Sequence, residues 1–478
     1  MALQPFDKIK TKIHNFTRSS IIESSIELLS IVEKEQKKNF PIWFVLVLVK
    51  WAFVYTKNTK FKKRATIHDI INILRLIEEF ESRRVIDFKF GIRRGLRILA
   101  YQQSLITENI HTDVFERQLA LYTQRKSRFD IESDFQKRTN LTIVDFIKMS
   151  QYTFIYLNMD KFNTWIYDGV LHQDYWDIMN KQFGHTKTKS FETILAFKGE
   201  SDILKLQKMT QEVYQLYETN LWTLKPFFFF RGNYRILHRT VFNLTVRDFI
   251  YDFMKRVAPE EFGREFGHRM ERYVEFGLEE SGKSFKNEQE LRLDFPGSGK
   301  IVDFLTEENL LIECKAIELH PRAGIIRKKE LLLNEFQDSI IKSYQQLLSA
   351  AQSIKCSIPA YGLVVTYKDT YVGFGSDAWS EFLERPILEF LKSSNIPLSV
   401  LPPENLCFIT IQDWDHMVQV VKEKPLSFKD IMHMAFSSFR SKIPDEQIMF
   451  FDQELKKQFP ISTTNLSYLQ NARTLLNN

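Results

Sequence analysis

The segment 300–316 places two carboxylates and an amine at a spacing that suits chemistry. Asp303 lies in a first stretch of alternating apolar and polar residues, Glu313 and Lys315 lie in a second, and turn-forming residues 306–309 separate the two. Such alternation predicts two half-buried strands, on which successive side chains point to opposite faces. Glu313 and Lys315 therefore share a face, and an odd-numbered hairpin turn brings Asp303 opposite Glu313. We expect these three groups to converge on one edge of a small sheet.

Two carboxylates held this close repel each other unless a cation lies between them. An all-oxygen site suits a hard divalent ion, so we expect Mg²⁺ or Mn²⁺ as the cofactor, held by Asp303 and Glu313. Such an ion polarises a phosphate and lowers the pKa of bound water. Lys315 would orient the attacking water or stabilise the transition state. An ordinary charged hairpin is the alternative, because a short motif needs its structural context.

Asp303 followed by Glu313-Cys314-Lys315 resembles the signature of the PD-(D/E)xK nuclease superfamily, although Val302 stands where the pattern usually has proline. The resemblance covers residues 241–425. It implies a restriction-endonuclease-like α/β core, in which helices flank a mixed central sheet. It also implies a metal-dependent nuclease that hydrolyses phosphodiester bonds of nucleic acid, with DNA favoured, in a setting such as restriction or anti-phage defence.

The resemblance extends to supporting residues. Glu271 matches a glutamate that many relatives carry on a helix before the core sheet, where it completes the metal site, and Glu275 lies one turn later on the same face. Gln345 matches the glutamine on the helix after the ExK strand, where it lines the site. The loop after Lys315 suits contacts with the nucleic-acid backbone. Its four cations are Arg322, Arg327, Lys328 and Lys329.

The elements around the motif follow an order that agrees with such a core. A helix is expected over 260–280, capped at Gly282, and a first strand over 288–295. After the hairpin we expect a helix over 331–353, strands over 361–366 and 406–411, and a helix from Asp413. Thr245 is expected to cap a helix over 246–257.

The length of 478 residues predicts more than one domain. Residues 1–240 show helical spacing with few glycines or prolines, and we expect a mostly helical domain that selects the substrate or regulates. It would offer the contact for a protein partner or a second copy. Residues 241–425 would form the nuclease domain, and residues 426–478 a helical C-terminal tail.

Composition sets further limits. An apolar content of 44% excludes a largely disordered chain, and a net charge of only +6 means that a basic binding face must be local. Aromatic and cationic residues alternate in two patches, 88–97 and 225–239, which would stack bases or simply form a buried aromatic face with solvated arginines.

Cysteines and apolar runs bear on location. Cys314, Cys356 and Cys407 show neither zinc-type spacing nor a disulfide framework, which favours reduced thiols in the cytoplasm. The first residues lack the layout of a signal peptide. The apolar run 40–55 is interrupted by Lys50 and is shorter than the ~20 residues of a spanning helix. It predicts a buried helix, with no membrane partner.

Two other functions stay open. One is a protein that uses the same fold to bind nucleic acid, or as a scaffold, without cleaving. The other is an NTPase, because residues 277–284 match the spelling of a phosphate-binding loop. That loop needs a strand before it and a helix after it, and the sequence predicts the reverse order here.

Overall fold

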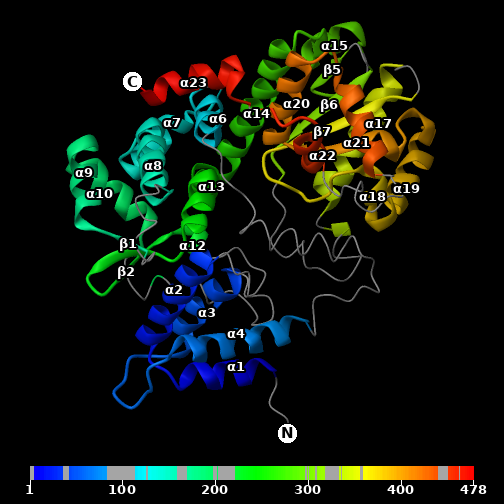
Figure 1. Ribbon diagram of the computed structural model, residues 1–478. Coiled ribbons are helices and arrows are strands. Elements are labelled where there is room, and N and C mark those ends of the chain that lie inside the picture. The colour runs from blue at the N-terminus through cyan, green and yellow to red at the C-terminus, as the bar shows by residue number, and fades with distance from the viewer. Residues whose placement is uncertain are drawn as a thin grey trace. The chain divides into compact units, whose positions relative to one another are not determined.

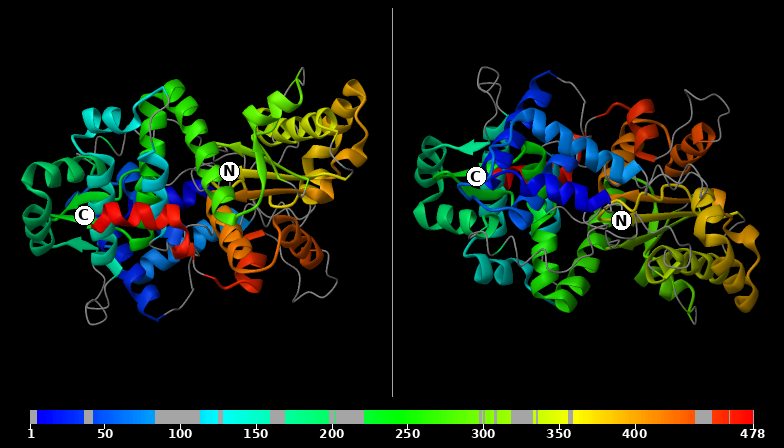
Figure 2. Two further views of the ribbon diagram at one scale, coloured as in Figure 1. Left: turned by 90° about the horizontal axis from the view of Figure 1, so that it is seen from above. Right: turned by 90° about the horizontal axis from the view of Figure 1, so that it is seen from below.

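A computed structural model gives the protein's structure. It describes residues 5–35, 42–82, 113–124, 128–158, 169–197, 202, 221–296, 299, 301–306, 309–317, 333–334, 336–355, 359–439, 451–461 and 463–477 (Figures 1 and 2). The chain forms two compact units. Unit 1 comprises Met1–Phe115 and Asp130–Val257, and unit 2 comprises Glu116–Phe129 and Ala258–Asn478.

The division between the units differs from the expected boundaries. Position 240/241 lies inside one continuous helix, α13 (Arg239–Val257), and the break comes where Pro259 begins α14 (Pro259–Ser281). Thr245 does not cap a helix, because it lies within α13 and its hydroxyl donates to the carbonyl of Val241 at 2.8 Å. The expected C-terminal tail belongs to unit 2.

Unit 1 is mostly helical, as predicted. Its described residues include the helices α1 (Pro5–His14), α2 (Arg18–Glu35), α3 (Ile42–Tyr55), α4 (Ile67–Ser82), α7 (Ile131–Thr139), α8 (Ile143–Asn158), α9 (Gln173–Phe183), α10 (His185–Leu195), α12 (Leu221–Leu224) and α13, while α6 (Asp113–Tyr122) has residues in both units. It also contains a small antiparallel sheet that we did not predict. The sheet has the order β1 (Val170–Leu171), β3 (Asn233–Ile236), β2 (Phe227–Phe230).

The apolar run at 40–55 forms the core helix of unit 1. Side chains from Trp43 to Phe53 along α3 are buried, and even Lys50 is only 7% exposed. The prediction of a buried helix is therefore confirmed. Among the helices that the structure describes, none combines the length and the apolar character needed to cross a bilayer.

In the described part of unit 2, strands form a mixed five-stranded sheet in the order β4 (Phe285–Asn287), β5 (Phe304–Thr306), β6 (Leu310–Lys315), β7 (Tyr361–Thr366), β8 (Leu406–Thr410). The first three strands are antiparallel and the last three are parallel. Helix α17 (Lys342–Ser353) lies on one side of the sheet and α20 (Ile411–Glu423) on the other (Figures 1 and 2). Helices on both sides explain why β7 is buried along its whole length.

Unit 2 contains further helices among its described residues. They are α18 (Gly375–Ala378), α19 (Glu384–Ser394), α21 (Phe428–Phe439), α22 (Phe451–Gln458) and α23 (Ser467–Asn477), with a π-helical turn η5 (Gln337–Ile341) before α17. The predicted strand over 361–366 is confirmed, and the strand predicted over 406–411 ends one residue early. There Thr410 caps α20 in a reciprocal capping box with Asp413.

The strand predicted over 288–295 is wrong. These residues form a short helix, α15 (Glu288–Asp294), and only the preceding Phe285–Asn287 pairs as a strand. The physical reason is a capping box: Asn287 accepts a hydrogen bond from the backbone of Glu290, whose carboxylate accepts one from the Asn287 backbone. The alternating leucines that suggested a strand do not share a buried face, since Leu291 is buried but Leu293 is 81% exposed.

The phosphate-loop spelling does not correspond to a phosphate loop. Gly277 lies within helix α14, and a Cβ there would come within 2.4 Å of the Trp414 indole nitrogen, so close packing of α14 on α20 requires glycine. Gly282 ends α14 in the left-handed conformation, at φ 67°, as predicted. A helix before the segment and strand β4 after it give the reverse of the order that an NTPase needs.

Candidate active site on the central hairpin

Strands β5 and β6 form the expected antiparallel hairpin. Phe304 pairs with Ile312, so the register continued by one residue places Asp303 opposite Glu313. Asp303 itself lies in a bend just before β5, and its Oδ2 accepts a hydrogen bond from the backbone nitrogen of Cys314 at 2.6 Å. The hairpin thus fixes the first carboxylate beside the strand that carries the second.

Glu313 lies in the interior of the sheet. It is 2% exposed, and its strand β6 pairs on the other side with β7. Lys315, one step along the same face, forms an ion pair with Oε1 of Glu313. Within the described residues, the other oxygen, Oε2, is buried and has no hydrogen-bond partner. A buried carboxylate oxygen without a donor is costly, and a cation would relieve that cost.

The electrostatics of the three groups are coupled. Burial raises the pKa of Asp303 well above its ordinary value, and the charges of Glu313 and Glu271 raise it further. Burial also raises the pKa of Glu313, although Lys315 opposes this. Burial works to lower the pKa of Lys315, but Glu313 and Asp303 overcome it and raise the pKa. One lysine therefore has to balance several carboxylates.

Glu271 on α14 belongs to the same electrostatic cluster. Burial raises its pKa, against the effect of His268, whose Nδ1 lies 3.3 Å from Glu271 Oε2. Glu288 and Lys315 also act on this carboxylate. Glu275 instead lies 3.5 Å from the side-chain nitrogen of Asn287, the residue that caps α15. The structure thus brings Glu271, rather than Glu275, into the field of the hairpin.

Glu288 is a residue that sequence reasoning missed. It is the first residue of α15, and its charge acts on both Glu271 and Glu313. The signal was present in the Asn287-to-Glu290 capping spacing, which marks a helix start there instead of a strand.

The remaining predicted residues are less well connected. Gln345 is half-buried on α17, and within the described residues its side chain makes no hydrogen bond with the hairpin carboxylates. The predicted backbone-binding cations, Arg322, Arg327, Lys328 and Lys329, lie outside the described residues, as do Cys356 and the patch 88–97. Cys314 and Cys407 are buried thiols without a disulfide.

The donor set fits a hard divalent cation in chemistry, because it consists of carboxylate oxygens and includes the orphaned Oε2 of Glu313. In the part of the chain that the structure describes, however, no three acidic, histidine or cysteine side chains already stand in a ligating arrangement. The reason lies in existing partners: the Cys314 amide engages Asp303, and Lys315 engages Glu313. Binding an ion would require these side chains to exchange partners.

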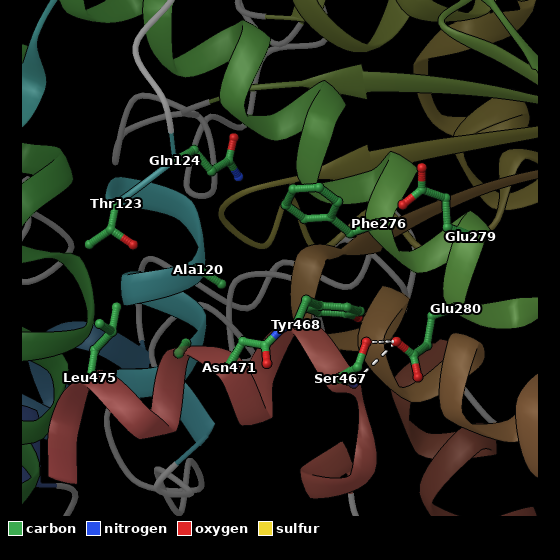
Figure 3. A pocket seen from close by; sticks show the side chains of 11 residues that line it. Ala120, Thr123, Gln124, Phe276, Glu279, Glu280, Ser467, Tyr468, Asn471 and Leu475 are labelled. Carbon is green, nitrogen blue, oxygen red and sulfur yellow. Dashed lines mark hydrogen bonds between the residues drawn. The ribbon is translucent and has the colours of Figure 1, made fainter. Parts of the chain in front are cut away.

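A separate cavity of about 740 Å³ opens elsewhere in unit 2 (Figure 3). Phe276 from α14 and Tyr468 from α23 line it, and at one end Glu280 accepts hydrogen bonds from the backbone and hydroxyl of Ser467. None of the residues that line it belongs to the carboxylate cluster on the hairpin.

Comparison of the chain with models of protein families, with curated proteins and with solved structures finds no match.

Proposed function

We propose that unit 2 is a divalent-metal-dependent nuclease built on a restriction-endonuclease-like core, which hydrolyses phosphodiester bonds of nucleic acid, with DNA favoured. The observation that supports it most directly is the buried Glu313 carboxylate, which lies opposite Asp303, pairs with Lys315 and keeps one oxygen without a donor. Two acids and a lysine in this arrangement are what the PD-(D/E)xK signature requires, and the sequence resembles that signature.

Each residue has a role that follows from its position. Asp303 and Glu313 would hold Mg²⁺ or Mn²⁺, and Glu271 would complete the set. The ion would supply polarisation of the phosphate and a lowered pKa of bound water. Lys315 donates to the Glu313 carboxylate and is therefore placed to hydrogen-bond an attacking water or the phosphate oxygens beside it. Gln345 on the adjacent helix α17 stays a weaker candidate for contact with the substrate.

A second function has its own support. The ion pair between Lys315 and Glu313 already occupies one oxygen of the buried acid, which also suits a protein that binds nucleic acid or a partner without cleaving. The two proposals differ in one respect that can be measured: only the nuclease forms a metal-dependent product.

The test is a cleavage assay on purified full-length chain with linear DNA, circular DNA and RNA, each in Mg²⁺, Mn²⁺ or EDTA. We expect cleavage that requires metal and disappears in Asp303→Asn and in Lys315→Met. Glu381→Gln, which removes an acid far along the chain from the motif, is the matched control and should cleave like the wild type. Equal cleavage by all variants would reject the residue assignment. Nucleic-acid binding without any metal-dependent product would favour the second function.

A further inference from the structure

The loop between α3 and α4 in unit 1 carries an unusual surface. Residues 57–64 read Lys-Asn-Thr-Lys-Phe-Lys-Lys-Arg, with five cations and no acid. Phe61 at its tip is 100% exposed, and the flanking Lys60 and Lys63 are exposed as well. Figure 1 shows this loop projecting beyond the helices that it connects. The ring of Phe61 is therefore fully accessible to a ligand, in the middle of a run of cations.

The loop is held in place by defined hydrogen bonds. The backbone nitrogen of Lys63 donates to Asn15 at 3.1 Å, and that of Thr17 donates back to Lys63 at 2.9 Å. The side chain of Asn58 accepts from the backbone of Ser19 at 3.0 Å. These contacts anchor both halves of the loop to the start of α2. Phe61 is thus presented from an ordered backbone, which reduces the entropy lost when a ligand binds.

A second segment, about 170 residues away in sequence, extends the same surface. Arg231 at the tip of the β2–β3 hairpin pairs with Oε1 of Glu23, while Arg64 from the loop pairs with Oε2 of the same carboxylate at 3.2 Å. One glutamate therefore joins two arginines from distant segments. The guanidinium of Arg231 also lies over the ring of Phe230, 5.8 Å from its centroid. We name this surface the basic-aromatic face: Lys57, Lys60, Phe61, Lys63, Arg64 and Arg231.

Among the described residues, the ion pairs of this face leave it with an excess of positive charge. Glu23 is shared between two arginines, so one negative charge faces two positive ones. Burial lowers the pKa of Lys62, and the charges of Arg18 and Lys57 lower it further. Cations around an exposed aromatic ring match a polyanion that also offers flat apolar surfaces. Single-stranded nucleic acid has phosphates for the cations and unpaired bases for the ring. A membrane surface would call for a broad apolar face instead of one phenylalanine.

We propose that the basic-aromatic face of unit 1 binds single-stranded nucleic acid, with Phe61 stacked on an unpaired base and the cations paired with phosphates. This site is independent of the hairpin carboxylates and does not require the chain to cleave. It assigns nucleic-acid binding to a face that the sequence motif does not include.

The test is fluorescence anisotropy of a labelled 20-nucleotide single strand with the full chain, in EDTA so that metal-dependent cleavage does not interfere. We expect Phe61→Leu, which keeps an apolar side chain but removes the aromatic face, to bind roughly tenfold more weakly or worse. Lys60→Gln and Lys63→Gln should each reduce the slope of log affinity against log salt by about 0.7. Because these side chains are exposed, the thermal midpoint of each variant should match that of the wild type.

Matched controls are Leu388→Ala and Arg385→Gln, which remove an exposed apolar side chain and an exposed cation from α19 in unit 2. Both should bind like the wild type. The proposal is overturned if Phe61→Leu binds the single strand as tightly as the wild type. It is also overturned if Phe61→Ala loses binding only to vesicles that contain an anionic lipid. Because binding is measured without cleavage, this experiment tests the binding site even if the nuclease proposal fails.

Discussion

Glu313 and Lys315, two residues apart on strand β6, form an ion pair in which one oxygen of the buried glutamate has no donor among the described residues. The lysine therefore neutralises the glutamate only in part, and Asp303 opposite adds a second carboxylate. The arrangement leaves a negative site that one amine does not balance. An incoming cation and Lys315 would compete for the same glutamate.

Because of this competition, we expect one variant to keep metal binding while it loses cleavage. Lys315→Met frees the Glu313 carboxylate, so we expect Mn²⁺ to bind at least as tightly as to the wild type, measured by calorimetry. Cleavage should fall by about 10²-fold or more, because a charged donor to the transition state is lost. Asp303→Asn should weaken both. If Lys315→Met lost metal binding together with cleavage, a role for Lys315 in catalysis alone would be wrong.

Glu271 and Glu275 form a matched pair on one helix, since they lie one turn apart on α14. Of these two glutamates, Glu271 is the one whose charge acts on both Asp303 and Glu313. We expect Glu271→Gln to weaken Mn²⁺ binding by about 10-fold to 100-fold, the range seen when groups around a metal are removed. Glu275→Gln should change it less than about threefold, as expected of a residue outside the shell around the ion. Equal effects of the two variants would place Glu271 outside the site.

A buried charge network predicts a large effect on stability. Asp415 is buried and accepts hydrogen bonds from Arg117 at 2.6 Å, from Tyr273 at 2.9 Å and from Tyr468 at 2.8 Å. Asp415→Ala removes the buried carboxylate to which Arg117, Tyr273 and Tyr468 donate, so the free energy of unfolding of unit 2 should fall by about 3–5 kcal/mol in urea titrations.

The control for this network is the double variant Arg117→Met with Asp415→Leu. It should recover most of the loss, because apolar replacement of a whole buried pair is often neutral. Arg385→Gln, which breaks an exposed ion pair with Glu389, should cost less than about 1 kcal/mol. A single Asp415→Ala variant as stable as the wild type would contradict the prediction.

Asp413 predicts a dependence of stability on pH. Burial and the charge of Asp452 raise its pKa from 3.8 to about 6 in the folded protein. The folded state then holds a proton that the unfolded chain has released. The stabilisation is complete below pH 3.8 and is lost as the pH rises to about 6.

Asp413→Asn tests this dependence, because an amide oxygen can still accept the hydrogen bonds from the backbone and hydroxyl of Thr410. The variant should match the wild type near pH 4 and become more stable relative to it by on the order of 2 kcal/mol by pH 7, measured as the difference in unfolding free energy. A difference that stays constant over this range would show that Asp413 titrates normally.

Much of unit 2 followed from local patterns. A short, mostly apolar run predicted β7 as a buried strand, and alternation predicted the β5–β6 hairpin. The hairpin register followed from its turn length, because side chains on a strand have a period of two. The glycine at 282 marked the end of α14, since caps use contacts within one turn. The cap at Thr410 was missed, because the strand was predicted to continue to 411 and the helix to begin at Asp413, whereas α20 begins at Ile411. Where a capping signal competed with apparent alternation, at 288–295, the cap was decisive, because two reciprocal hydrogen bonds fix the first turn of a helix.

The sequence by itself therefore determined the identity and pairing of Asp303, Glu313 and Lys315, because their relation depends on one strand and one turn. Only the tertiary structure decided that Glu271 rather than Glu275 joins them, that residues 116–129 belong with unit 2, and that a loop at 57–64 meets the hairpin at Arg231. Each of these depends on contacts between segments far apart in the chain. Local periodicity carries no information on which distant surface a helix face or loop will meet, since packing of whole elements sets those contacts.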